Sequence, residues 1–147
     1  MTEPLHDPLP MLPGYALRRA ANSCAAELTA RLAKLDLRQS EASVLILIGG
    51  NPGVTAAALG RQLDIQRANM VPLLKRLEEA GLIDRAPIDG KSQGLALSVS
   101  GQERTAAAHA IIDAYEAELL ARVPAEHRRH LLPALAALWC QGRTVPS

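Results

Sequence analysis

The stretch "DIQRANMVPLLKRLEEAGLIDR", residues 64–85, decides the fold. Its second half places apolar side chains at three- and four-residue steps, which predicts a helix with one buried face. The expected buried stripe is Val71, Leu74 and Leu77, with Leu73 at its margin. Gly81 stands where a helix commonly ends in a left-handed residue. The front of the segment differs, because its side chains are small or polar and Pro72 follows them.

The preceding segment, "VTAAALGRQLDI" over residues 54–65, predicts a shorter helix. Thr55 is a suitable N-cap, and Leu59 and Leu63 share its inner face. Asp64 falls at the turn that follows, where Asp tolerates a left-handed backbone better than most residues. Two helices joined by such a short turn are typical of a helix-turn-helix.

The following residues have a β-strand pattern. "LIDRAPI" (82–88) and "GLALSVS" (94–100) flank the polar, glycine-bearing tip "DGKSQG" (89–94). This arrangement predicts a β-hairpin, and a helix-turn-helix with such a hairpin is a winged helix. Helix then resumes, with Ser100 and Glu103 at capping-box spacing.

The two ends of the chain are expected to be helical beyond a proline-rich arm. From Gly14 an apolar stripe runs along one helix, consisting of Leu17, Ala21, Cys24, Leu28, Leu32 and Leu35. Ser40 is the expected cap of a short buried helix, "EASVLILI". The helix after the hairpin has a less regular stripe, which consists of Ala107, Ile111, Ala114, Glu118 and Leu119. Pro124 is expected to start the last helix, and Pro133 to kink it. The side chains of that helix expected to face inward are Leu131, Leu135 and Leu138.

The predicted fold is therefore mainly α with a small β-hairpin wing. Its expected parts are a flexible arm (1–13), a helical dimerisation region (14–37 and 101–141) and a winged helix-turn-helix (38–100). The terminal helices carry more apolar surface than a small winged helix can bury, which favours a shared dimer layer over an enlarged monomeric core.

Composition limits the function classes. The chain has 147 residues, is 48% hydrophobic without Phe, and carries a formal charge of +1, so no overall basic field marks a polyanion partner. Neither a signal peptide nor a run of apolar residues long enough for a membrane span is expected, which favours a cytoplasmic location. No catalytic grouping, metal cluster or cofactor motif is found; His127 and His130 lie on an amphipathic helix and lack further ligands.

The order of these elements resembles the MarR (multiple antibiotic resistance regulator) family of bacterial transcription factors, over about residues 14–140. The similar text is "NPGVTAAALGRQLDIQRANMVPLLKRLEEAGLIDR" followed by "DGKSQGLALSVSG". In the second stretch Asp89, Lys91, Leu95, Leu97, Ser98 and Gly101 stand where the family has an Asp-x-Arg wing signature. The resemblance implies a dimeric repressor that a small ligand releases from a pseudo-palindromic operator.

The resemblance also implies a set of DNA-binding residues, because a reading helix uses its N-terminal turns in the major groove. Gln and Asn pair with adenine, Arg with guanine or phosphate, and Met or Pro contacts a thymine methyl. The set is Thr55, Gln66, Arg67, Asn69, Met70, Pro72, Leu73, Arg76, Arg85 and Lys91. Two other interpretations stay open, in which Gln66 and Asn69 only cap the helix and Arg67 is only a solvated charge.

The sequence departs from the family pattern in three places. Pro72 lies beyond the first helical turn, where proline removes a hydrogen bond and bends the helix. Lys91 stands at the wing tip where the family generally has Arg, which fits a narrow minor groove better. Residues 61–91 hold six basic against five acidic side chains, so phosphate contacts must be summed over two copies.

Family members commonly respond to a small anionic aromatic or phenolic compound in a cleft beside the dimer layer. The candidate ligand-binding residues here are Tyr15, Arg19, Asn22, Ser43 and His109, although each can equally be an ordinary surface or dimer-facing side chain. Two alternative functions remain. One is a winged-helix module that binds protein, and the other is a redox-sensing regulator that uses Cys24 and Cys140.

Overall fold

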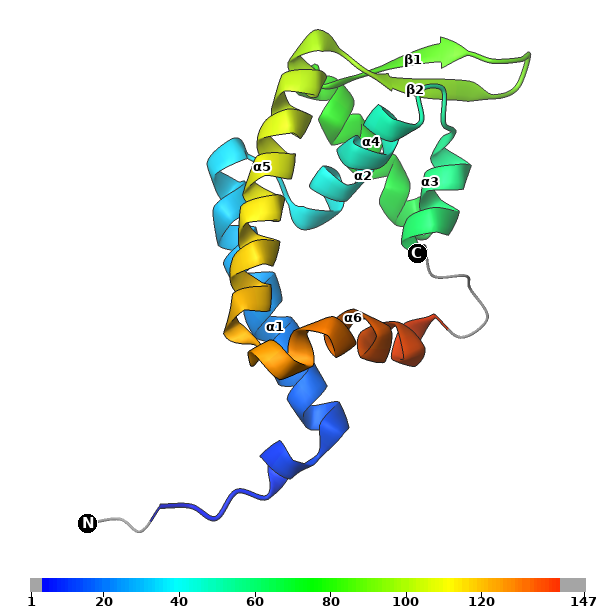
Figure 1. The fold of residues 1–147 in the computed structure, drawn as a ribbon. Helices are drawn as coiled ribbons and strands as arrows, with labels where there is room; N and C mark the ends of the chain where they lie inside the picture. Colours follow the sequence, from blue (N-terminus) through cyan, green and yellow to red (C-terminus); the bar gives the residue numbers. More distant parts are fainter. Residues whose placement is uncertain (1–3, 141–147) are drawn as a thin grey trace. The chain divides into compact units, whose positions relative to one another are not determined.

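The computed structural model describes residues 4–140, and its element order is that of a winged helix with flanking helices (Figure 1). The helices and strands are η1 (Leu9–Met11), α1 (Pro13–Leu32), η2 (Ala33–Leu35), α2 (Gln39–Gly50), α3 (Ala56–Leu63), α4 (Arg67–Glu79), β1 (Ile83–Pro87), β2 (Gln93–Leu97), α5 (Val99–Arg122) and α6 (Ala125–Trp139). The chain divides after Ile111 into two compact units. The mainly α fold with a β-hairpin is confirmed. Of the expected arm, residues 1–3 lie outside the described part, as does residue 141 of the expected dimerisation region.

The core of the first unit is aliphatic, as expected for a chain without Phe. Leu45 of α2, Leu59 of α3 and Leu74 of α4 are each at most 1% exposed, so three helices meet there. Leu82, Ile83 and Leu95 extend this core under the hairpin. Burying one such leucine stabilises the fold by about 1.5–3 kcal/mol, and the hairpin is therefore packed onto the helices by its own apolar side chains.

Local backbone signals create the helix-turn-helix. The hydroxyl oxygen of Thr55 accepts the N–H of Ala58 at 3.2 Å and caps α3. Asp64 ends α3 in the left-handed region with φ 54°. The N–H of Ile65 then donates to the carbonyl of Gly60 at 2.9 Å, and a Cβ on Gly60 would lie only 2.9 Å from the Ile65 oxygen. The tight turn predicted from the sequence is confirmed, and Gly60 is what lets it close.

The wing is an antiparallel hairpin in which Ile83 pairs with Leu97 and Pro87 with Gln93. A third segment joins the hairpin. The N–H of Gly53 donates to the carbonyl of Leu95 (2.8 Å), and the N–H of Leu95 donates to the carbonyl of Val54 (2.9 Å). This extra bridge ties the loop before α3 to β2. It was not predicted from the sequence.

The buried stripe of α4 begins one residue earlier than expected. Met70 is 2% exposed and packs with Leu74 and Leu77, whereas Val71 is 57% exposed. The predicted burial of Val71 was therefore wrong, and so was the outward placement of Met70. Gly81 does take the predicted left-handed conformation, with φ 71°.

Two helix starts also differ from the sequence prediction. Arg38, not Ser40, is the N-cap of α2, with the Glu41 carboxylate accepting the Arg38 N–H at 2.8 Å. Ser98, not Ser100, caps α5, because its hydroxyl oxygen accepts the N–H of Gly101 at 2.9 Å. In both cases the cap lies two residues before the serine predicted from the sequence.

The terminal helices leave much apolar surface uncovered in a single copy. Within the first unit, α1 is buried only at its C-terminal residue Leu32, and Leu17 is 41% exposed. In the second unit, α6 has no buried residue, and Leu132 and Trp139 are 74% and 70% exposed. The stripe expected on α5 is also shifted, since the buried residues include Ala108 and Tyr115 while Ala114 is exposed.

Candidate nucleic-acid interface

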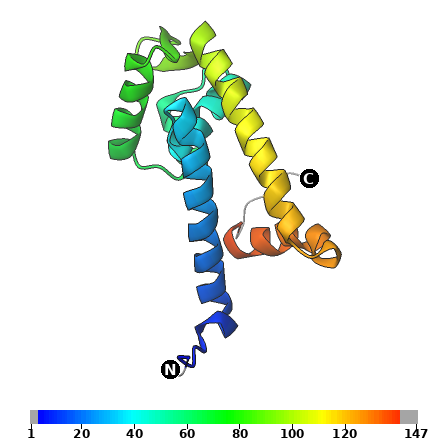
Figure 2. The same ribbon diagram turned by 90° about the vertical axis from the view of Figure 1, so that its left-hand side faces the viewer.

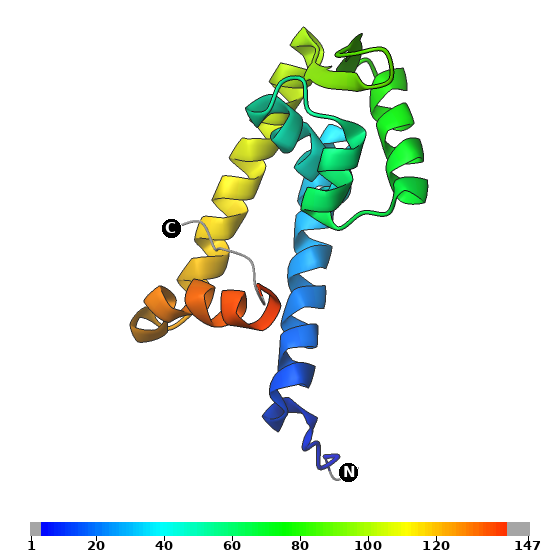
Figure 3. The same ribbon diagram turned by 90° about the vertical axis from the view of Figure 1, so that its right-hand side faces the viewer.

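The front turns of α4 are exposed on the outer edge of the first unit (Figures 2 and 3). Gln66 is the N-cap residue, but its side chain makes no capping hydrogen bond. Its side chain is exposed, as are those of Arg67 and Asn69. The interpretation that Gln66 serves only as a cap is therefore wrong, and its amide is left for another partner.

An ion pair fixes α4 against the start of α2. Nε of Arg76 lies 2.8 Å from a carboxylate oxygen of Glu41, which is only 2% exposed. The same guanidinium reaches Asp36 at 3.3 Å. Since Glu41 also accepts the N–H of Arg38, one buried carboxylate caps α2 and holds α4. Arg76 is thus engaged within the protein.

A second ion pair joins α4 to the wing. The Arg85 guanidinium on β1 binds both carboxylate oxygens of Glu78 on α4, the second at 3.3 Å. Bidentate pairs of this kind fix orientation as well as adding energy. Arg76 and Arg85 thus anchor the exposed helix at two points, and the DNA contacts expected of them stay a prediction.

We expect Glu41→Ala to lower the free energy of unfolding by about 2 kcal/mol, because it removes a cap and both contacts of a buried carboxylate. Urea unfolding of the purified protein measures this. Glu79→Ala is the matched control, since Glu79 lies 3.9 Å from Lys75 with both side chains about two-thirds exposed, and such surface pairs contribute under about 1 kcal/mol. Equal stabilities of the two variants would show that the Glu41 contacts add nothing.

The wing tip is shaped by Asp89. Its carboxylate accepts the backbone N–H groups of Lys91 at 2.9 Å and Ser92 at 2.7 Å. These two hydrogen bonds, to Lys91 first and Ser92 second, lower the pKa of Asp89. The turn presents Lys91 to solvent at the end of the hairpin.

The order of this tip is expected to depend on pH in one direction. Because the pKa of Asp89 is lower in the folded protein, its hydrogen bonds are fully present above the ordinary Asp value of about 3.9 and are lost as pH falls through the lowered value. Amide NMR shifts of Lys91 and Ser92 across an acid titration report this loss. Asp89→Ala should show, at every pH, the amide shifts that the native protein has only in acid. A change of these shifts above pH 5 in the native protein would contradict the assignment.

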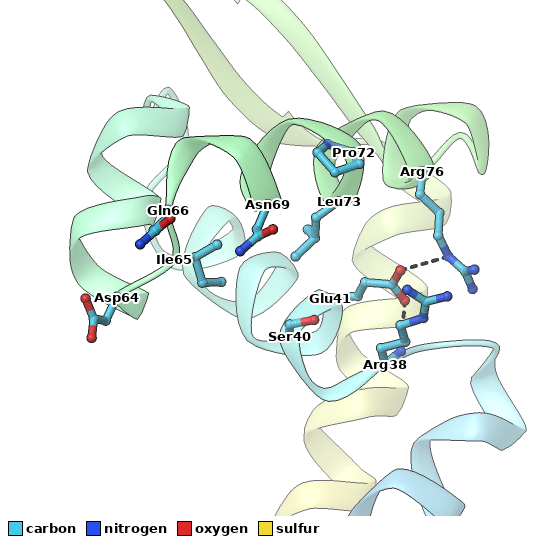
Figure 4. A pocket seen from close by; sticks show the side chains of 10 residues that line it. All are labelled: Arg38, Ser40, Glu41, Asp64, Ile65, Gln66, Asn69, Pro72, Leu73 and Arg76. Atoms are coloured by element: carbon cyan, nitrogen blue, oxygen red, sulfur yellow. Dashed lines mark hydrogen bonds and ion pairs between the residues drawn. The ribbon is translucent and has the colours of Figure 1, made fainter.

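An open groove of about 690 Å³ runs along the side of α4 that faces the start of α2 (Figure 4). Leu73 and Asn69 face it from α4 and Ser40 from α2. Its full lining is Arg38, Ser40, Glu41, Asp64, Ile65, Gln66, Asn69, Pro72, Leu73 and Arg76. The groove therefore shares several residues with the expected reading face.

The expected ligand-binding residues are not among those that line this groove. Tyr15 is half-buried and its ring lies 5.5 Å from the Arg18 guanidinium carbon. The Ser43 hydroxyl donates to the Gln39 carbonyl within α2 at 3.0 Å. Arg19, Asn22 and His109 are exposed. Cys24 and Cys140 are half-buried and form no disulfide.

Other kinds of site were searched for in residues 4–140. No group of three or more His, Cys, Asp or Glu side chains there has an arrangement that could hold a metal ion. None of the described helices combines the length and apolarity needed to cross a membrane.

The outward set on α4 differs partly from the one expected. Arg67, Asn69 and Pro72 are exposed as predicted, Leu73 is half-buried, and Met70 is buried. Between Arg67 and Lys75, three exposed residues were missed, namely Ala68, Val71 and Lys75. The charge of Lys75 and its spacing of eight from Arg67 were the available signals for one of them. Thr55 uses its hydroxyl oxygen as the α3 cap, which leaves its O–H as a donor.

Comparisons with known proteins give a consistent result. The sequence profile described as the MarR family matches residues 35–92, which contain α2 to the wing tip. The HTH-type transcriptional repressor Rv2887 of Mycobacterium tuberculosis is 30% identical over 127 residues, which cover 85% of this chain and 91% of that protein. Its crystal structure with salicylic acid matches with a TM-score of 0.68 at 30% identity, over 86% of this chain and 95% of the other.

Structures of the transcriptional repressor CouR are also similar. CouR bound to a 23-mer DNA duplex matches with a TM-score of 0.84 and 31% identity, over 93% of this chain and 99% of that chain. CouR bound to p-coumaroyl-CoA matches with a TM-score of 0.80 and 30% identity, over 92% and 97%. The similarity therefore spans nearly the full length of both chains.

Proposed function

The chain belongs to the MarR family, and we propose that it is a transcriptional repressor that binds operator DNA as a homodimer and is released by a small aromatic acid or its thioester. The observation that carries the proposal is the exposed polar front of α4, held outward by buried leucines and by two ion pairs at Arg76 and Arg85. Relatives described as DNA-bound and ligand-bound support both halves of the proposal.

The dimer is inferred from uncovered surface. Most of α1 and all of α6 lack buried residues, and Leu132, Leu138 and Trp139 are each over 60% exposed. Isolated exposed leucines need no explanation, but contiguous apolar faces on terminal helices do. A twofold axis would set two reading helices about 34 Å apart and double the number of phosphate contacts.

The proposed contact set consists of exposed or half-buried residues that take part in no ion pair within the described part of the chain. Gln66, Arg67 and Asn69 read base edges or phosphates, and Thr55 and Lys91 contact the backbone at either side. Pro72 and Leu73 border the same face. Arg76 and Arg85 act by positioning α4, and Met70 supports it from behind.

The effector is proposed to be an aromatic carboxylate or a thioester of one. Rv2887 is described with salicylic acid and CouR with p-coumaroyl-CoA. Tyr15, Arg19, Asn22, Ser43 and His109 remain the proposed ligand-binding residues. Thermal-shift measurements with salicylate, p-coumarate and p-coumaroyl-CoA, with and without operator DNA, test this directly. A true effector raises the Tm of the free protein and weakens the DNA complex by linkage.

A gel shift with the duplex upstream of the protein's own gene tests the DNA half of the proposal. The proposal is supported if the protein retards this duplex and an excess of unrelated DNA does not displace it. If neither that duplex nor any from a randomised library is bound, the winged helix is a protein-binding module instead. The proposal includes a cytoplasmic location, where the DNA is, and no catalytic activity.

A further inference from the structure

The outward face of α4 has an apolar centre. Val71 is 57% exposed, and Ala68 and Pro72 are exposed beside it. Residues three and four apart share one face of a helix, so these three side chains form one patch on consecutive turns. Lys75 continues the same face one turn later and is also exposed.

Folding of the single chain does not account for this patch. The buried side of α4 is already supplied by Met70, Leu74 and Leu77, each at most 2% exposed. Proline in a helix interior costs about 3 kcal/mol, and a β-branched residue on an exposed helix face is less favourable than Lys, Glu or Gln. Val71 and Pro72 are both unfavourable for an exposed helix position, and their adjacency indicates that a partner covers the patch.

The charges around the patch identify that partner as a polyanion. Arg67 precedes it and Lys75 follows it. Lys75 is held only by the exposed pair with Glu79 at 3.9 Å, which is weak enough to exchange for a phosphate. An apolar centre between two cations matches a DNA groove, where phosphates lie on both sides of the base edges.

In the major groove, the apolar group that bases present is the C5 methyl of thymine. We propose that Ala68, Val71 and Pro72 read thymine methyl groups, so that each operator half-site carries thymines opposite this patch. This inference rests on the proposed DNA-binding function and names the base that its reading helix selects. Val71 is the central specificity-determining residue.

The experiment starts from the full-length protein and duplexes selected from a randomised library copied with dTTP. Each thymine position is then replaced by deoxyuridine, which lacks only the methyl group, one position at a time and in both half-sites of the duplex. At the one or two positions opposite the patch, the Kd is expected to rise about 10- to 20-fold, the effect of losing one buried methyl in each of two half-sites. Other thymine positions should show little change.

The variant Val71→Ala tests whether that methyl is read by Val71. On the thymine duplex the substitution should weaken binding, and on the duplex with deoxyuridine at the sensitive position it should have no further effect, as a double-mutant cycle requires for a direct contact. Val99→Ala is the matched control, since Val99 is 74% exposed on α5.

The outcomes separate the two proposals. Failure to select any duplex would overturn the proposed DNA-binding function itself. Selected duplexes that lack thymine, or that bind equally well with deoxyuridine at every position, would overturn the methyl-reading patch and leave DNA binding intact. Equal effects of Val71→Ala on the thymine and deoxyuridine duplexes would likewise overturn it.

Discussion

Gly101→Ala is expected to destabilise the fold by about 3 kcal/mol or more, with a fall in Tm of about 10 °C. A Cβ at this position would lie 1.9 Å from the carbonyl oxygen of Leu82 and 2.9 Å from its carbonyl carbon. The Leu82 backbone has little freedom to move, because its N–H donates to Leu77 and its oxygen accepts the N–H of Ser98, both at 3.0 Å. One methyl group therefore forces α5 away from the base of the wing.

The matched control is Gly50→Ala. Gly50 is also helical, and a Cβ there meets nothing within 4 Å. This substitution should leave stability unchanged or raise it by up to about 1 kcal/mol, because alanine is the better helix former. Urea unfolding and calorimetry of both variants measure the difference. A Gly101→Ala protein as stable as the native one would mean that α5 and Leu82 are not in contact.

Much of the fold could be predicted because its signals are local. Thr55, Asp64 and Gly81 each act within a few residues of their own position, and each does what the sequence indicated. The resemblance to the MarR family is confirmed for the same reason, since its motifs are spacings along one chain. A hairpin between two short apolar runs with a polar tip is likewise a local pattern.

The sequence could not settle which side of α4 faces the core. Met70 and Val71 are adjacent and both apolar, so either can begin a stripe that continues through Leu74 and Leu77. Packing against α2 and α3 decides between them, and the flexible Met side chain fills the buried position. This single shift exposes Val71 and changes which base contacts the helix can make.

The roles of the arginines also depended on tertiary structure. Arg76 and Glu41 are 35 residues apart in the sequence, and their pairing is visible only when α4 lies beside α2. Arg85 and Glu78 are closer in sequence, but Glu78 lies on a helix and Arg85 on a strand, so their spacing alone does not predict the pair. Counting basic residues therefore gave no sign that two of them are held by carboxylates of the protein itself, and Arg67 is the exposed arginine of α4 without such a pair.

Arg67→Ala is expected to lower operator affinity by about 100- to 10,000-fold. Arg67 is exposed on the first turn of α4, with Gln66 and Asn69 beside it, so its guanidinium is placed to bind guanine or a phosphate. One such contact is worth about 1–3 kcal/mol, and a twofold complex loses two of them. Fluorescence anisotropy with the selected duplex, at one fixed salt concentration, measures the change.

The control Lys34→Ala removes another exposed positive charge, which lies in η2 and outside the proposed contact set. Both variants reduce the net charge by one, so a loss that came only from the overall field would be the same for both. A large loss confined to Arg67→Ala requires a contact made by the front of α4. If both variants bind as the native protein does, the exposed turn at Gln66 is not what DNA meets, and the wing or the groove beside α4 must supply the contacts instead.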